Sequence, residues 1–439
     1  MSKKILSIIV LLTLVVSLLV GCKSETKTKN VSSNDDEKTT ESNSNKEKKP
    51  VTIKVATWTD TVNAFTEIIK EFEKENPLIK VDLIEFPSQE HQDKLVVQLA
   101  GGADIDVMAM KNTADYSDIA VKNQLLQLDD LVKKYGLEVA SFGPLYNGLK
   151  IDNKLYSLPF TKSSWVLYYN KDLFDKAGVD YPSDDMTWAE FRELAKKMTR
   201  GEGNEKIWGA YLHTWPQSWY GPGLQTGATI VDEDLTPFKD ALQLRMDLEK
   251  DGSIMSYIEQ KATNAHYKTE FAKGTLAMNI IGEWHIDQLR TLEKEGTVTF
   301  DWDIAPMPHP EGVSPNTTWG MASPIGINAK SKKVDASWEF IKFATGLEGA
   351  KIFAEYGRLP AYNSDEIKKI YVGDGNSKPN NIGILVEQKV YFENPTVPGA
   401  KIVKDEIFGK EAELTFAGER SVEDTMKVIL ERTKSELNK

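Results

Sequence analysis

Two hydrophobic periodicities alternate along residues 51–110, and this alternation constrains the fold more than any other feature of the chain. Apolar and polar residues alternate at 51–56 and at 79–86, as in half-buried strands, and 105–110 is a third run of strand length. Residues 65–72 and 95–99 carry apolar side chains at helical spacing. The order strand, helix, strand, helix, strand predicts a parallel sheet with right-handed crossovers.

The alternation continues to the end of the chain. Further strands are predicted at 155–159, 164–169, 276–281, 302–306 and 325–328. A capping box at Thr187 and Glu190 opens one predicted helix, and others are predicted at 334–345 and after Ser421. Because residues 51–439 exceed what one hydrophobic core usually supports, we expect an α/β protein with two domains.

Residues 1–21 have the layout of a secretory signal peptide. Two lysines precede an apolar run at 5–20, which is shorter than the roughly 20 residues of a membrane-spanning helix. Gly21 then precedes Cys22, the single cysteine of the chain. This ending resembles the lipobox of bacterial lipoproteins. The resemblance implies cleavage before Cys22, acylation of Cys22 by fatty acids such as palmitate, and a location on the extracytoplasmic face of the cell membrane.

Residues 22–50 are predicted to be a disordered tether behind the lipidated cysteine. Val31 is the only aliphatic residue after Cys22 in this segment, so the segment cannot bury enough apolar surface to offset its chain entropy. The formal net charge of the chain is −12 at pH 7, and this acidic balance argues against nucleic acid as a partner.

Several stretches of the body occur in the order and spacing of a known family. The chain resembles the extracellular solute-binding proteins, family 1, of bacterial ABC sugar importers, the group that includes maltodextrin-binding protein. The stretches that carry the resemblance are 72–77, 79–81, 94–101, 106–107, 168–174, 271–278, 282–284, 336–345 and 357–361. Ile105 departs from the family, which usually has proline there, and this affects the local turn only.

The resemblance implies a two-lobed periplasmic-binding-protein fold of the type II-like class. Each lobe would be a mainly parallel sheet flanked by helices, and several hinge crossings would join the lobes. The first lobe would hold 51–162 plus 302–348, and the second would hold 163–301 plus 349–439. A carbohydrate, by this resemblance an oligosaccharide, would bind in the cleft between them, the lobes would close around it, and a monomer would deliver it to the permease subunits.

Candidate ligand residues follow from the chemistry of a sugar ring, which offers an apolar face and a rim of hydroxyls. Such a ligand favours aromatic platforms with polar partners, at the carboxyl ends of strands and in loops. The residues selected on this ground are Trp58, Asp60, Lys111, Asn112, Trp215, Trp219, Tyr220, Glu283, Trp284, Trp319 and Arg358. Only Trp284 is also carried over from the family resemblance. Trp188, Trp208, Trp302 and Trp338 occupy periodic positions and are assigned to the core.

The sequence leaves three other functions open. Asp60 and Glu283 could form the carboxylate pair of a glycoside hydrolase. A glycan-binding surface sensor or adhesin would share the anchor, and a binding protein for a non-sugar solute would share the fold. The five histidines form no His-x-x-x-His pair and no second thiol exists, so we expect no zinc site. A calcium loop, a phosphate-binding Gly-x-x-x-x-Gly-Lys run and a Gly-x-Ser-x-Gly motif are also missing, and we therefore assign no metal, no other cofactor and no catalytic residue.

Overall fold

The computed structural model describes residues 49–375 and 377–439. The predicted signal peptide (1–21), the lipidated Cys22 and nearly all of the predicted tether (22–50) lie outside the described residues, so these three remain predictions. Within the described part of the chain, no helix is long and apolar enough to cross a membrane.

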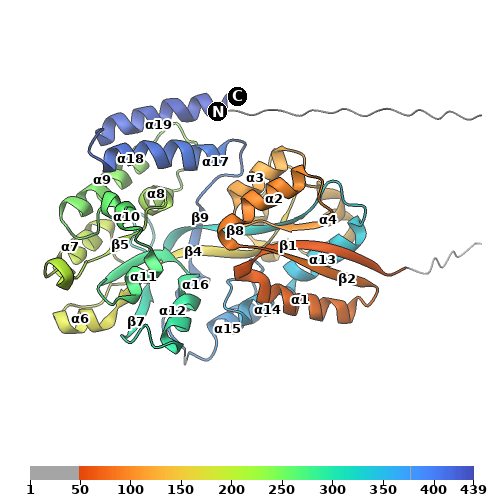
Figure 1. The fold of residues 1–439 in the computed structure, drawn as a ribbon, viewed down its shortest axis with the longest axis horizontal. Helices are drawn as coiled ribbons and strands as arrows, with labels where there is room; N and C mark the ends of the chain where they lie inside the picture. Colours follow the sequence, from red (N-terminus) through yellow and green to blue (C-terminus); the bar gives the residue numbers. More distant parts are fainter. Residues whose placement is uncertain (1–48, 376) are drawn as a thin grey trace, which may run out of the picture. The chain divides into compact units, whose positions relative to one another are not determined.

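Nine strands form one mixed sheet in the order β2-β1-β3-β8-β4-β6-β5, with β7 paired to β4 and β9 paired to β8 (Figure 1). The strands are β1 (Val51–Trp58), β2 (Ile79–Phe86), β3 (Val107–Ala109), β4 (Leu158–Asn170), β5 (Tyr211–Leu212), β6 (Met278–Gly282), β7 (Trp302–Ala305), β8 (Thr317–Ile327) and β9 (Lys389–Phe392).

The direction of the strands differs from the expected mainly parallel sheets. The pairs β1–β2, β1–β3, β5–β6 and β8–β9 are parallel. The pairs β3–β8, β4–β8, β4–β6 and β4–β7 are antiparallel. The fold is therefore α/β as predicted, but the sheet is mixed, because β4 runs antiparallel to β6, β7 and β8, and β8 runs antiparallel to β3.

Two hydrophobic cores divide the helices. The first core packs against α1 (Val62–Glu75), α2 (His91–Ala100), α3 (Thr113–Val121), α4 (Asp129–Tyr135), α5 (Pro144–Gly148), α13 (Val334–Thr345) and α14 (Leu347–Glu355). The second packs against α6 (Lys171–Ala177), α7 (Trp188–Met198), α8 (Gln217–Leu224), α9 (Thr236–Lys250), α10 (Tyr257–Thr263), α11 (Tyr267–Ala272), α12 (His285–Lys294), α15 (Asp365–Val372), α16 (Ile384–Glu387), α18 (Lys410–Phe416) and α19 (Val422–Leu437).

The remaining elements are short. They are α17 (Ala400–Ile402), the π-helix η5 (Val403–Gly409) and the 3₁₀ helices η1 (Thr59–Thr61), η2 (Ser88–Glu90), η3 (Ala140–Phe142) and η4 (Gly203–Glu205). The capping box of Thr187 and Glu190, the cap at Ser421 and the bounds of α13 are confirmed.

The two long strands β4 and β8 cross from one core to the other and pair side by side along the way (Figure 1). Phe160 on β4 lies in the first core and Trp165 lies in the second. A Cβ atom on Gly320 of β8 would lie 1.9 Å from the carbonyl oxygen of Ser163, so glycine allows the close approach of the two strands. The lobes are thus joined by paired backbone rather than by loops alone.

Side-chain packing differs from the expected lobe boundaries around β7 and β8, at α14 and at Ala361, which lies in the first core. Trp302 and Trp319 pack in the second core, because β7 pairs with the second half of β4 and Trp319 lies on the half of β8 beside it. Phe353 on α14 packs in the first core against Phe65 and Phe160.

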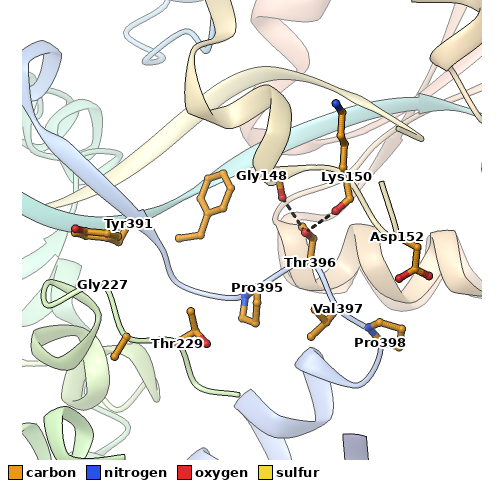
Figure 2. A pocket seen from close by; sticks show the side chains of 12 residues that line it. Gly148, Lys150, Asp152, Gly227, Thr229, Tyr391, Pro395, Thr396, Val397 and Pro398 are labelled. Carbon is orange, nitrogen blue, oxygen red and sulfur yellow. Dashed lines mark hydrogen bonds between the residues drawn. The ribbon is translucent and has the colours of Figure 1, made fainter. Parts of the chain in front are cut away.

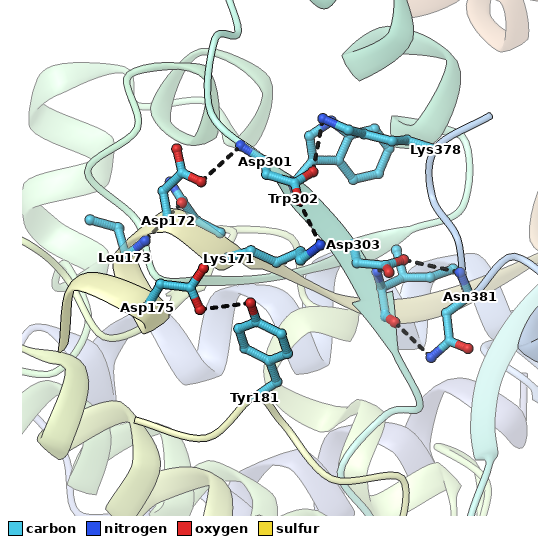
Figure 3. Close-up of polar contacts among 12 residues, drawn as sticks. Lys171, Asp172, Leu173, Asp175, Tyr181, Asp301, Trp302, Asp303, Lys378 and Asn381 are labelled. Atoms are coloured by element: carbon cyan, nitrogen blue, oxygen red, sulfur yellow. Dashed lines mark hydrogen bonds and ion pairs between the residues drawn. The ribbon is translucent and has the colours of Figure 1, made fainter. Parts of the chain in front are cut away.

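Polar contacts hold the segment between α15 and α16 beside β7 (Figure 3). The Lys378 ammonium lies 3.0 Å from Asp301 and 2.8 Å from Glu293, and Lys171 also pairs with Asp301. The Asn381 backbone N–H donates to the Asp303 carboxylate at 3.1 Å. These contacts hold residues 378–381 beside β7, immediately before α16.

Candidate functional site

A wall of aromatic rings forms where β6 meets α12. Trp284 is half-buried there, and its indole N–H donates to the Tyr267 hydroxyl at 3.1 Å. The Trp284 ring centroid lies 6.0 Å from that of Trp165 and 6.3 Å from that of Trp215. Trp215 is also half-buried and contacts Tyr267 edge to face. The wall therefore offers partly exposed rings held in fixed orientations by one another.

Gly282 permits this arrangement. A Cβ atom at this position would lie 1.9 Å from a carbon of the Trp284 ring. The indole can thus fold back over the end of β6 only because residue 282 has no side chain.

Three histidines support the wall from behind. The rings of His213, His266 and His285 lie with centroids 5.5, 4.2 and 5.1 Å from that of Tyr267. Burial lowers the pKa of His213 and of His285 to about 3, and burial also lowers the pKa of His266. These imidazoles are therefore neutral at physiological pH and act as packing surfaces.

Glu283 is buried at the foot of the wall and joins β6 to β4. Its carboxylate accepts hydrogen bonds from the Ser164 backbone N–H at 3.0 Å and from the Ser163 hydroxyl at 3.1 Å. Burial raises the pKa of Glu283 to about 7, although these two hydrogen bonds and the nearby Arg358 favour the charged form. Both carboxylate oxygens are thus already committed to the neighbouring strand.

The first lobe contributes a smaller set around Trp58, which is buried and belongs to the first core. The Lys111 ammonium lies 5.8 Å from the centroid of the Trp58 ring and donates to the Ser88 hydroxyl at 2.7 Å. That hydroxyl donates to the Asp60 carboxylate at 2.6 Å. Burial lowers the pKa of Lys111, and the charge of Asp60 opposes that shift. A chain of polar contacts thus runs from Lys111 to Asp60 at the end of β1.

Arg358 links this set to the wall. Its guanidinium donates to the backbone carbonyl of Asp60 at 2.5 Å, and its charge also acts on Glu283. The charge of Asp60 in turn raises the pKa of Tyr267 on the wall, behind the larger effect of burial. Asp60 of the first lobe and Tyr267, Glu283 and Arg358 therefore lie within electrostatic reach of one another.

The structure places three of the expected ligand aromatics in the second core instead. Trp219 and Tyr220 are buried against Phe408, and Trp319 is fully buried beside Trp165 and Trp188. The physical reason for the first two is that residues 217–224 form the helix α8 and not the expected loop. A helix packed on the core turns these rings inward, where they are buried.

Asn112 has a structural task. It caps α3, where its amide oxygen accepts from the Asp115 backbone N–H at 2.8 Å and its amide nitrogen donates to the Asp115 carboxylate at 2.9 Å. Both ends of the amide are therefore already used.

The sequence interpretation missed Tyr267 and Lys162. Lys162 lies on β4 at the crossing between the lobes, and burial lowers its pKa. A signal for it exists in the sequence, because Thr161, Lys162, Ser163 and Ser164 interrupt an otherwise apolar strand. A polar interruption of this kind is unexpected in a buried strand and marks a surface or a site.

A separate pocket of about 340 Å³ lies beside the segment that follows β9 (Figure 2). Residues from both lobes line it, among them Lys150 and Thr229, and the Thr396 hydroxyl donates to the Gly148 carbonyl at 2.8 Å. None of the ligand residues expected from the sequence lines this pocket.

Among the residues that the structure describes, no three His, Cys, Asp or Glu side chains are grouped so as to hold a metal ion. The expectation that the protein needs no cofactor remains a prediction.

Residues 56–351 match the family model of the bacterial extracellular solute-binding proteins. The chain belongs to this family. Solute-binding proteins of this family are extracytoplasmic, and their shared property is ligand binding rather than catalysis. The two-lobed periplasmic-binding-protein fold predicted from the sequence is confirmed.

Relatives and solved structures cover most of this solute-binding protein. An arabinooligosaccharide-binding protein of Bacillus subtilis is 24% identical over 323 residues, which are 70% of this chain and 72% of the relative. An sn-glycerol-3-phosphate-binding periplasmic protein of Agrobacterium fabrum is 28% identical over 64% of this chain and 67% of its own.

Two solved structures extend this similarity to the fold. The open conformation of a sugar transporter from Rhizobium etli has a TM-score of 0.79 and 34% identity, and covers 88% of this chain and 99% of that one. An ABC substrate-binding protein from Listeria monocytogenes in complex with cycloalternan has a TM-score of 0.76 and 26% identity, and covers 88% of this chain and 98% of that one.

Proposed function

We propose that this solute-binding protein is the substrate-binding subunit of an ABC importer and captures a carbohydrate, in particular an oligosaccharide. The observation that carries the proposal is the wall of half-buried Trp284 and Trp215 against the buried Tyr267, with Asp60 and Arg358 close enough to act electrostatically on Tyr267 and Glu283. Aromatic faces with polar groups at their edge suit a sugar ring. The sugar ligands in the names of related proteins support the same class of ligand.

In this proposal the apolar face of the sugar stacks on Trp284, and Trp215 extends the platform. Asp60, Lys111 and Arg358 fix the hydroxyl groups. Glu283 positions Ser163 and Ser164, and Trp58 backs Lys111 from the first lobe. Trp219, Tyr220, Trp319 and Asn112 are not part of this site.

Delivery requires that the lobes move. We propose a first lobe of 51–162 plus 322–353 and a second of 163–319 plus 354–439, which follow the two cores except at Ala361, a member of the first core. Closure about the crossing strands would trap the ligand and create the surface that the permease subunits bind. A lipid on Cys22 would hold the monomer on the extracytoplasmic face of the membrane.

The test is calorimetric titration of the mature chain with a panel of mono- and oligosaccharides. Trp284→Ala should weaken binding of the best ligand by about 1–3 kcal/mol, because the variant loses an aromatic platform. Trp208→Ala, at a half-buried tryptophan of the same lobe outside the site, should leave affinity unchanged. Equal affinity of wild type and Trp284→Ala would remove the assignment of this site.

Two further measurements separate the other functions. Incubation with oligosaccharides should release no new reducing ends, whereas a glycoside hydrolase would release them. Scattering should show a smaller radius of gyration with ligand bound. A sensor or adhesin that does not close would keep its radius unchanged.

A further inference from the structure

The hydroxyl of Tyr267 ends a chain of hydrogen bonds that begins at His285 on α12. The His285 Nδ1 atom lies 3.0 Å from the side-chain oxygen of Gln288. The side-chain nitrogen of Gln288 donates to the Tyr267 hydroxyl at 3.3 Å, and the Trp284 indole N–H donates to the same oxygen at 3.1 Å. Two donors therefore converge on one phenolic oxygen in the aromatic wall.

The burial of His285 sets the direction of this chain. Burial lowers the pKa of His285 to about 3, so the ring is neutral and carries one hydrogen at physiological pH. Its Nε2 atom is buried and has no hydrogen-bond partner among the described residues. A buried N–H without an acceptor is rarer in proteins than a buried acceptor without a donor, which places the hydrogen on Nδ1. This N–H then donates to the Gln288 oxygen, and the Gln288 nitrogen faces Tyr267.

The Tyr267 hydroxyl thus keeps one unused hydrogen. A hydroxyl oxygen accepts two hydrogen bonds and donates one, and Trp284 and Gln288 occupy both accepting positions. Within 49–375 and 377–439, no residue accepts a hydrogen bond from Tyr267. The ring of Tyr267 is buried, but both of its donors are half-buried, and the charge of Asp60 in the first lobe acts on it. The acceptor for this hydrogen is therefore solvent or a bound molecule.

We infer that Tyr267 donates this hydrogen to a hydroxyl oxygen of the bound sugar and thereby determines which sugars bind. The inference rests on the proposed function and specifies a feature of its ligand. A sugar ring stacked on Trp284 has its rim of hydroxyls beside the indole edge, and the Tyr267 oxygen lies 3.1 Å from the nitrogen of that edge. A ligand with a hydrogen atom or an ammonium group at this place offers no acceptor, so its binding leaves the Tyr267 hydrogen unpaired.

The experiment is calorimetric titration of the mature chain at pH 7.5 with arabinotriose, mannotriose and maltotriose. The trisaccharide that binds tightest is then compared with its monodeoxy analogues, each of which lacks one hydroxyl. For the hydroxyl that meets Tyr267, the deoxy analogue should bind about tenfold more weakly than the parent sugar, or weaker still. The matching fluoro analogue should bind more tightly than the deoxy analogue, because fluorine can accept a hydrogen bond and cannot donate one.

Tyr267→Phe removes the donor and keeps the ring. It should bring the parent sugar and that deoxy analogue within about threefold of each other. Tyr181→Phe is the matched control, because it removes a hydroxyl that donates to Asp175 at 2.7 Å elsewhere on the second lobe. This control should keep the preference of the wild type for the parent sugar.

Three results would overturn this inference alone. A preference that survives Tyr267→Phe would show that another group binds the hydroxyl. Equal losses for the parent sugar and all its deoxy analogues in Tyr267→Phe would show that the hydroxyl only holds the wall. A fluoro analogue that binds no better than the deoxy analogue would show that Tyr267 is not the donor. If none of the three trisaccharides binds, the proposed capture of an oligosaccharide fails together with the inference.

Discussion

Glu283 is a buried acid, and burial destabilises its charged form. Its pKa is about 7 in the folded chain because of burial, against an ordinary value of 4.5. A raised acid pKa stabilises the fold below pH 4.5, and this contribution is lost as pH rises through 7. We expect the free energy of unfolding of the wild type to fall by up to about 3 kcal/mol between pH 4.5 and 8 because of Glu283. Glu283→Gln does not titrate and should remove this fall.

Urea unfolding of both proteins at several pH values measures this difference. The free energy of unfolding of the variant minus that of the wild type should rise with pH across the window and level off above pH 8. A difference that stays constant from pH 4.5 to 8 would show that Glu283 is not a buried acid of raised pKa. The comparison uses the difference between variant and wild type because other groups titrate in the same range, and their contributions cancel in that difference.

Among the elements, the paired crossing strands β4 and β8 join the two cores. Gly320→Ala would place a Cβ atom 1.9 Å from the Ser163 carbonyl oxygen, and backbone cannot move aside as a side chain can. We expect a loss of about 2–4 kcal/mol in the free energy of unfolding, measured in urea. Gly383→Ala is the matched control, because its Cβ would meet no atom within 4 Å and it should change stability little. Equal stabilities of the two variants would contradict this account of β8.

The crossing strands also show where sequence reasoning stops. Local periodicity predicts β2 and α13 to the residue, because each buries one face within its own lobe. It divides β4 into two strands, because the polar run 161–164 breaks the apolar pattern and the pairing partner β8 lies far along the chain. Whether a candidate side chain faces the cleft depends on such distant contacts, so Trp284 and Trp319 look alike in sequence and differ in the structure.

Across the whole molecule, buried neutral histidines make the fold sensitive to acid. Burial lowers the pKa of His91 to about 4 in the first lobe, and of His213 and His285 to about 3 in the second. The unfolded chain therefore binds more protons than the folded chain below pH 6.5, and stability falls as pH falls through this window. At pH 5 each histidine should cost about 2 kcal/mol of folding stability, and the three together about 6 kcal/mol, which outweighs the opposite effect of Glu283.

His91→Phe tests this account. The ring of His91 packs edge to face against Trp58 and Phe86, so a phenyl ring can take its place without titrating. Urea unfolding at pH 5 and 7.5 should show a smaller loss of stability for the variant, by about 2 kcal/mol. If wild type and His91→Phe lose equal stability on acidification, the acid sensitivity arises from other groups. Because the histidines lie in both lobes, acid should destabilise both lobes together and not only the wall of aromatic rings.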